Sequence, residues 1–189
     1  LTVPREAFVS KHQQAFAYVD EDLPLSNGRN LMEPMVLARL VQALEIRAGD
    51  NVLVVGAASG YGSAIIAHLA GSVIAIETRA QTVEKAQENL VAHGVDNAAV
   101  VKSRLVDGYS NEGPYDKILV EGGVETMSVS LLQQLAPKGR LAAVYRPHDA
   151  PIGVASLWTR SGKDFTRKSL FDASVPNLDE FNKKPEFTF

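Results

Sequence analysis

The chain contains no cysteine and only one tryptophan among its 189 residues. The absence of cysteine excludes disulfide bonds and thiolate metal ligands. The four histidines (His12, His68, His93 and His148) are too far apart in the sequence to indicate a set of metal ligands, so we expect no metal site. The chemistry of this chain must therefore depend on other residue types.

The sequence also lacks long apolar runs and any excess of positive charge. Its apolar stretches are much shorter than the roughly 20 residues that cross a bilayer, and the start LTVPREAF has no signal-peptide pattern. The formal net charge is -3, and no dense lysine and arginine patch is present that would follow a phosphate backbone. We predict a cytoplasmic protein, monomeric or homodimeric, that binds neither membranes nor nucleic acid. Because the chain starts at Leu1 without a methionine, we expect a trimmed form of a longer product.

What the sequence does contain is a regular alternation of apolar strands and amphipathic helices. Residues 33–46 repeat apolar side chains every three or four positions, which predicts a helix with Pro34 in its first turn. Strands are then expected at 51–55, 72–77, 98–102, 115–121 and 140–146, with helices at about 60–70, 80–92 and 129–135 between them and a turn at PKG (137–139). This alternation is typical of βαβ units on a parallel sheet.

The alternation stops after residue 150. Segments 153–160 and 165–172 are rich in β-forming residues and are joined by the short turn SGKD, so they predict a hairpin. Such a hairpin would extend one edge of the sheet in the antiparallel sense. We therefore predict an α/β fold with a mostly parallel, seven-stranded sheet that ends in an antiparallel hairpin. The tail from Ser174 is expected to be irregular and packed by its aromatic residues.

The loop GAASGYG, residues 56–62, connects the first of these strands to a helix. Open α/β sheets bind ligands beyond the carboxyl ends of their strands, and this loop is the usual place. Gly56 and Gly60 supply unusual torsions and space, and we expect Ser59 to cap free N–H groups at the start of the helix. The dinucleotide motif G-x-G-x-x-G fails at its second and third glycines, and no GK[ST] follows, which argues against NAD and against a P-loop nucleotide.

Glu77 ends the next strand, about 20 residues after Gly56. A carboxylate at this place can accept hydrogen bonds from both hydroxyls of a ribose, as it does in NAD enzymes and in S-adenosylmethionine-dependent methyltransferases. The alternative is that Glu77 merely solvates the end of a strand. Together with the small-residue loop, the position favours a cofactor role.

Five segments together resemble the protein-L-isoaspartate (D-aspartate) O-methyltransferase family: VPREAFV (3–9), AYVDEDLPL (17–25), VLVVGAASGYGSA (52–64), GPYDKILV (113–120) and QLAPKGRLAAV (134–144). The resemblance implies a class I, Rossmann-like methyltransferase fold with S-adenosyl-L-methionine as cofactor and S-adenosyl-L-homocysteine as product. It implies carboxyl methylation of L-isoaspartyl (D-aspartyl) residues in damaged proteins or peptides, the first step of their repair. The chain would then be a single domain with a substrate-side segment (1–32), a cofactor-binding core (33–150) and a C-terminal hairpin and tail (151–189).

The resemblance also implies the site residues. The substrate loop of the family, G-Q-T-I-S-x-P, aligns with residues 28–34, which places Asn30 and Met32 at catalytic positions and Arg29 and Leu31 at substrate-binding positions. Met32 replaces the family's serine, and a thioether cannot donate a hydrogen bond. Arg29 could instead offer a charged fork to the acceptor carboxylate. The implied cofactor-binding residues are Gly56, Ala57, Ala58, Ser59, Gly60, Glu77, Thr78, Arg104, Leu105 and Glu121.

Several of these positions depart from the family pattern. Ala58 replaces a glycine, Val54 replaces an acidic residue, and Glu121 stands where small residues are usual. Glu121 would either hold the ammonium group of the cofactor or repel an anionic acceptor. The departures leave three alternatives open: a methyltransferase with another acceptor, a non-catalytic binding protein, and an NAD oxidoreductase. The last fits Glu77 but neither the loop nor the terminal hairpin.

Overall fold

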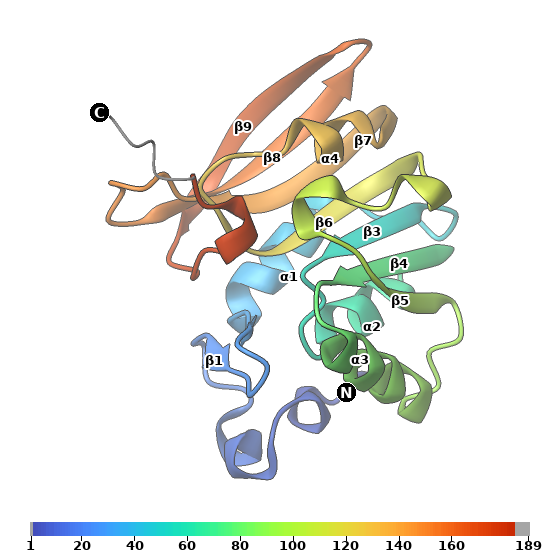
Figure 1. Cartoon of the computed structure of the whole chain (residues 1–189), viewed down its shortest axis with the longest axis vertical. Helices are drawn as coiled ribbons and strands as arrows, with labels where there is room; N and C mark the ends of the chain where they lie inside the picture. Colours follow the sequence, from blue (N-terminus) through green and yellow to red (C-terminus); the bar gives the residue numbers. More distant parts are fainter. Residues whose placement is uncertain (1, 184–189) are drawn as a thin grey trace.

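Seven strands form one sheet in the computed structural model, in the order β5-β4-β3-β6-β7-β8-β9 (Figure 1). The structure describes residues 2–183. The strands are β3 (Asn51–Val55), β4 (Ser72–Glu77), β5 (Ala98–Lys102), β6 (Tyr115–Val124), β7 (Leu135–Tyr145), β8 (Gly153–Ser161) and β9 (Asp164–Ala173). The pairs from β5 through β7 are parallel, whereas β7 with β8 and β8 with β9 are antiparallel. This arrangement confirms the predicted parallel sheet with its antiparallel end.

The sheet separates two hydrophobic cores because side chains alternate along each strand. In β3, Val52 and Val54 belong to one core, and Leu53 and Val55 belong to the other. The first core contains residues of three helices, α1 (Pro34–Leu44), α2 (Tyr61–Ala67) and α3 (Ala80–Ala92). The second contains residues of the 3₁₀ helices η3 (Leu105–Asp107) and η5 (Asp179–Phe181) and of the short helix α4 (Val129–Gln133). Burial on both faces explains why residues 52–55 are all apolar.

Several expected boundaries are wrong by a few residues. Helix α1 ends at Leu44 because Glu45 adopts a left-handed conformation with φ of 51°. Helices α2 and α4 are shorter than expected. The predicted turn at 137–139 instead lies within β7, which starts at Leu135, pairs with Tyr115 and contains a register shift with Lys138 at φ of 65°. A local irregularity therefore replaces the turn without ending the strand.

Strand β6 extends beyond the predicted residue 121 to Val124 because the C-terminal segment pairs with its end. The Gly123 N–H donates to the Pro176 carbonyl at 2.8 Å, and the Leu178 N–H donates to the Gly123 carbonyl at 2.8 Å. Phe181 is buried in the second core, so this aromatic residue of the tail packs against the fold as predicted. Phe187 lies outside the described residues.

The segment before α1 and the C-terminal segment contact each other through Arg29 and Glu180. In Figure 1, β1 and the red C-terminal segment both lie to the left of β3, β4 and β5. The N-terminal part contains the 3₁₀ helices η1 (Arg5–Phe8) and η2 (Lys11–Phe16) and the two-stranded sheet of β1 (Leu23–Pro24) and β2 (Asn30–Leu31). One more 3₁₀ helix, η4 (Ser110–Glu112), precedes β6. Among the described helices, none has the length and apolar character that crossing a membrane requires.

Candidate active site

The loop after β3 passes through three residues in the left-handed region: Gly56 (φ 80°), Ala58 (φ 51°) and Gly60 (φ 89°). The N–H groups of Gly56 and Ala57 both donate to the Ile76 carbonyl, at 3.1 and 3.2 Å, which fastens the loop to the end of β4. The buried Ala58 therefore keeps a glycine-like conformation although it carries a side chain. This conformation is strained, because L-residues other than glycine pay about 1–2 kcal/mol to adopt it.

Replacing Ala58 with glycine is expected to raise the free energy of unfolding by about 1 kcal/mol or somewhat less. The relief of left-handed strain exceeds the extra entropy that glycine gives the unfolded chain. Urea denaturation would measure the change. The matched control is Gly56→Ala, which should lose about 1 kcal/mol or more because it introduces the strain that Ala58→Gly removes. Destabilisation by Ala58→Gly would contradict the strain argument.

Ser59 does not perform the capping role predicted for it. The N-cap of α2 is Gly60, which makes no side-chain cap, and the buried Ser59 hydroxyl has no hydrogen-bond partner among the described residues. The left-handed Gly60 stands between the serine and the helix, so Ser59 precedes the capping position by one residue. Ser59 contributes through its backbone, since its carbonyl accepts from Asn89 Nδ2 at 2.8 Å.

Glu77 ends β4 with only 1% of its surface exposed, and its carboxylate is fully engaged. It accepts from Arg29 Nε at 3.1 and 3.2 Å and from Arg29 Nη2 at 3.0 Å. It also accepts from the N–H groups of Ala58 at 3.0 Å and Thr78 at 3.1 Å. Glu77, the residue expected to bind a ribose, thus already accepts from the Arg29 guanidinium and from backbone N–H groups of the two loops beside it.

The Arg29 guanidinium connects Glu77 to the C-terminal segment. Its Nη1 donates to Glu180 Oε2 at 3.1 Å and its Nη2 to Glu180 Oε1 at 2.9 Å, while Nη2 also lies 3.3 Å from Thr78 Oγ1. Burial acts to lower the pKa of Arg29, but the hydrogen bonds and charges of Glu180 and Glu77 outweigh it and raise that pKa above its ordinary value. Arg29 is therefore a permanently charged bridge, with 12% of its side chain exposed.

Beside this bridge lies a small cavity of about 60 Å³. Its lining combines the substrate-loop residues Gly28, Arg29, Asn30 and Met32, the strand residues Glu121 and Gly122, and the segment 175–179. Leu178 covers the neighbouring glycines: a Cβ added to Gly122 would lie 2.5 Å from Leu178 Cγ, and one added to Gly56 would lie 3.4 Å from Leu178 Cδ1. Pockets for small-molecule ligands usually exceed about 300 Å³, so this cavity is small for a ligand. A second hollow, of about 260 Å³, lies beside Ala58 and Ser59 of the loop.

Glu121 is a buried carboxyl group at the end of β6, with 4% exposure. It packs against Gly62 so closely that a Cβ there would collide with it, and its Oε1 has no hydrogen-bond partner among the described residues. Burial raises the pKa of Glu121 to about 8, the charge of Glu77 adds to this rise, and the charge of Arg5 opposes it. Below that pH the group is mainly a neutral acid.

Curated proteins and a family model are similar in sequence to this chain over most of its length. The family model described as protein-L-isoaspartate(D-aspartate) O-methyltransferase matches residues 1–150. Protein-L-isoaspartate O-methyltransferase from Methanoculleus marisnigri is 37% identical over 184 residues, which cover 97% of this chain and 83% of that protein. Protein-L-isoaspartate O-methyltransferase 1 from Rhodopseudomonas palustris is 38% identical over 183 residues, covering 97% and 71%. The chain belongs to the protein-L-isoaspartate O-methyltransferase family.

Solved structures agree with this family on the fold. A protein-L-isoaspartate O-methyltransferase superposes with a TM-score of 0.84 at 21% identity, covering 93% of this chain and 58% of that one, so this chain spans less than two thirds of its length. A second, from Plasmodium falciparum and in complex with S-adenosyl-L-homocysteine, has a TM-score of 0.72 at 21% identity and coverage of 95% and 87%. The fold is thus that of the class I methyltransferases, as the sequence resemblance implied.

Not all residues implied by the family pattern lie together. Arg29, Asn30 and Met32 line the small cavity, whereas Leu31 is fully buried, pairs with Leu23 in the two-stranded sheet and is absent from the cavity lining. Leu105 is fully buried in the second core. The Arg104 side chain is 77% exposed and forms an ion pair with Asp107 at 3.2 Å, so it points to solvent rather than into the site.

Two partners of the site were missed by reasoning from the family motifs. Glu180 lies in the irregular tail, far in sequence from Arg29, and no local sequence pattern indicates that the two residues pair. Arg5 is fully buried and joins the N-terminal segment to the substrate loop, since its Nη2 donates to the Met32 carbonyl at 2.8 Å and its Nε to the Ala17 carbonyl at 2.5 Å. The arginine of the VPRE motif was a usable signal for this second contact.

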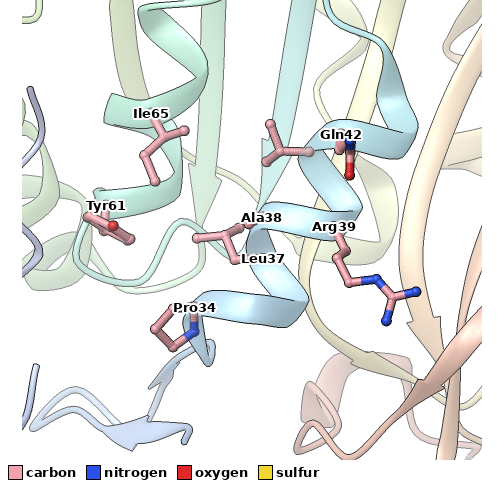
Figure 2. A pocket seen from close by; sticks show the side chains of 8 residues that line it. Pro34, Leu37, Ala38, Arg39, Gln42, Tyr61 and Ile65 are labelled. Atoms are coloured by element: carbon pink, nitrogen blue, oxygen red, sulfur yellow. The ribbon is translucent and has the colours of Figure 1, made fainter. Parts of the chain in front are cut away.

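A larger hollow of about 590 Å³ lies elsewhere, between α1 and α2 (Figure 2). Figure 2 shows Leu37 of α1 and Ile65 of α2 projecting towards each other, with Tyr61 and Pro34 nearby and Arg39 turned away towards the hairpin. The guanidinium of Arg39 lies 3.5 Å from the ring centre of Phe171. None of the site residues implied by the family pattern lines this hollow. It is therefore separate from the candidate active site.

Proposed function

We propose that this family member transfers the methyl group of S-adenosylmethionine to the carboxyl group of L-isoaspartyl (D-aspartyl) residues in damaged proteins or peptides. The observation that carries the proposal is the pairing of Glu77, at the end of β4, with the N–H of Ala58 in the loop after β3. It joins a carboxylate that can accept from a ribose to the loop after β3, at the carboxyl ends of two adjacent parallel strands.

The residues present fit the nucleoside of this cofactor chemically. Glu77 offers two carboxylate oxygens, and the donors that reach them in this conformation include two nitrogens of one guanidinium. A carboxylate that accepts this pair of donors can equally accept two hydroxyls of a ribose. The cavity must widen for the cofactor to enter, since its volume is about 60 Å³.

The reaction asks for little acid–base chemistry from the chain. When bound, S-adenosylmethionine supplies a sulfonium whose methyl group is already electrophilic. A carboxylate acceptor with an ordinary pKa of about 3.9 is ionised at neutral pH, so no general base is needed. The chain's contribution is to orient the acceptor through Arg29 and Asn30 and to exclude water with Met32 and Leu178. Such positioning and replacement of solvent are recognised sources of rate enhancement.

We also propose a division of labour along the chain. Residues 1–32 form the substrate side, residues 33–150 hold the cofactor, and residues 151–189 complete the cover. The contacts of Arg29 with Glu77 and with Glu180 support this division, because they join the three parts at one point. We propose a cytoplasmic monomer or homodimer, and the net charge of -3 favours peptide acceptors over nucleic acid.

Calorimetric titration with S-adenosylhomocysteine, followed by methyl transfer to an isoaspartyl peptide, tests the proposal. We expect micromolar binding of the product and methylation of the isoaspartyl peptide, with no methylation of the same peptide carrying normal aspartate. The normal peptide is the control because it has the same sequence. It differs only in that the backbone continues through the α-carboxyl group of the aspartate rather than through its side-chain carboxyl group.

Failure at either step has its own meaning. Binding of the product without methylation of the isoaspartyl peptide would contradict the acceptor assignment and support a methyltransferase with another acceptor, which the replacement of a serine donor by Met32 favours. A lack of product binding would contradict the enzyme assignment itself and support the non-catalytic alternative.

A further inference from the structure

Arg29 contacts two acids that belong to different parts of the site. Glu77 at the end of β4 is buried and fixed by two loop N–H groups, whereas Glu180 is carried by η5 in the C-terminal segment. Arg29 is the only basic residue among those that line the small cavity in the described part of the chain. Its guanidinium is therefore both the partner of the cofactor-binding acid and the cation nearest to an incoming acceptor.

Glu77 cannot hold Arg29 and a ribose together. A carboxylate has about four lone-pair sites, and Glu77 already accepts from Arg29 Nε, Arg29 Nη2 and the N–H groups of Ala58 and Thr78. The two N–H contacts fix the loops on either side of the carboxylate, so the guanidinium is the exchangeable donor. A cofactor that uses Glu77 must displace it.

The displaced guanidinium stays over the cavity because the Arg29 backbone is held independently. The Arg29 N–H donates to Asn27 Oδ1 at 3.0 Å, and the Arg29 carbonyl accepts from the Leu25 N–H at 2.8 Å. A guanidinium that gives up Glu77 keeps Glu180 but has its Nε and one Nη2 N–H group free to donate. The acceptor carboxylate has the matching charge and can bind the guanidinium in the same two-pronged geometry.

We propose that Arg29 is exchanged between Glu77 and the carboxylate of the acceptor, so that binding of the cofactor creates the acceptor site. This inference rests on the proposed function. In the free protein Arg29 closes the site by pairing with Glu77. When the nucleoside takes Glu77, Arg29 keeps Glu180 as a partner and presents its free nitrogens to the isoaspartyl carboxylate. The product should therefore raise the affinity for the peptide, and the peptide the affinity for the product, by the same factor.

Arg29→Gln is the decisive variant, because the proposal predicts that it raises the affinity for the product and lowers the affinity for the peptide. S-adenosylhomocysteine should bind about 5-fold or more tightly, since its competitor for Glu77 is gone. The isoaspartyl peptide should bind product-saturated protein about 10-fold or more weakly and show a raised KM, since a charge-assisted pair is lost. In the unaltered protein, the product should raise peptide affinity at least about 5-fold, and in Arg29→Gln this coupling should vanish.

Arg79→Gln is the matched control. Arg79 donates to the Asn27 carbonyl at 2.9 Å and so contacts the same loop, but it makes no contact with Glu77 in the described structure. We expect it to leave product affinity, peptide affinity and their coupling unchanged. Arg29→Lys, which keeps the charge but not the fork, should shift both affinities in the same directions as Arg29→Gln by smaller factors, and thermal unfolding would verify that each variant is folded.

The outcomes separate this inference from the proposed function. Weaker product binding in folded Arg29→Gln, or peptide affinity that does not depend on the product in the unaltered protein, would overturn the exchange. If the unaltered protein binds the product but methylates no isoaspartyl peptide, the proposed acceptor is wrong. The product titration of Arg29→Gln would still decide whether Arg29 competes for Glu77.

Discussion

Replacing Glu77 with glutamine is expected to lower the free energy of unfolding by about 3–5 kcal/mol, the usual result of removing one partner from a buried ion pair. Glutamine has a single acceptor oxygen, whereas the Glu77 carboxylate receives donors from Arg29, Ala58 and Thr78. The largely buried Arg29 would keep only Glu180. Urea denaturation would measure the loss, and product affinity should fall by about 1.5–3 kcal/mol because a charged acceptor is lost.

A double-variant cycle shows which contact produces the loss. Adding Arg29→Gln to Glu77→Gln removes the stranded cation and should recover part of the stability, so the two effects should not be additive. Glu84→Gln on the exposed face of α3 is the control and should change stability by less than about 0.5 kcal/mol. A loss below about 1 kcal/mol for Glu77→Gln would contradict the role of Glu77 as the anchor of the closed site.

Replacing Glu121 with glutamine is expected to remove a strong pH dependence of stability. The pKa of Glu121 is raised from 4.5 to about 8 in the folded state, so the folded protein binds this proton more tightly than the unfolded chain does. The resulting stability is fully present below pH 4.5 and is lost as the pH rises towards 8, by about 1.4 kcal/mol per pH unit. Glutamine resembles the neutral acid and does not titrate.

The free energies of unfolding of Glu121→Gln and of the unaltered protein should therefore differ increasingly as the pH rises above 4.5. Near pH 4.5 their free energies of unfolding should be similar, and at pH 7 Glu121→Gln should be more stable by roughly 3 kcal/mol. Urea denaturation at several pH values compares them directly, and every other titrating group cancels in the difference. Glu88→Gln, at an exposed surface pair, should show no such divergence. Parallel curves for Glu121→Gln and the unaltered protein would contradict the prediction.

The parts of the fold that follow from local pattern could be predicted from the sequence. The uninterrupted apolar run of residues 52–55 indicates a strand buried on both faces, and β3 lies in the interior of the sheet. The hairpin turn at residues 162–163 needs only local turn chemistry, and Gly162 supplies the left-handed residue. The PKG stretch misled because glycine and proline can mark a bulge as well as a turn.

The site was predictable only where it depends on residues that are close together in the sequence. The loop after β3 and the acid at the end of β4 are indicated by their positions along the chain. The state of that acid depends on Arg29 and Glu180, which are distant from it and from each other in sequence, and a single sequence carries no record of such a pairing. The missing cap of Ser59 has a different, local origin: a one-residue shift in where α2 begins decides it.

The antiparallel end of the sheet has a consequence for the solubility of the protein. Strand β9 forms one border, and among the described residues no strand pairs with its outer edge. The exposed Arg167 and Lys168 lie in its middle, and a register shift interrupts its pairing with β8 near Ala155. Charges and irregularities at a free edge oppose edge-to-edge addition of another strand, the first step of β-aggregation. The protein can thus carry an open sheet border without adding a strand from another chain to it.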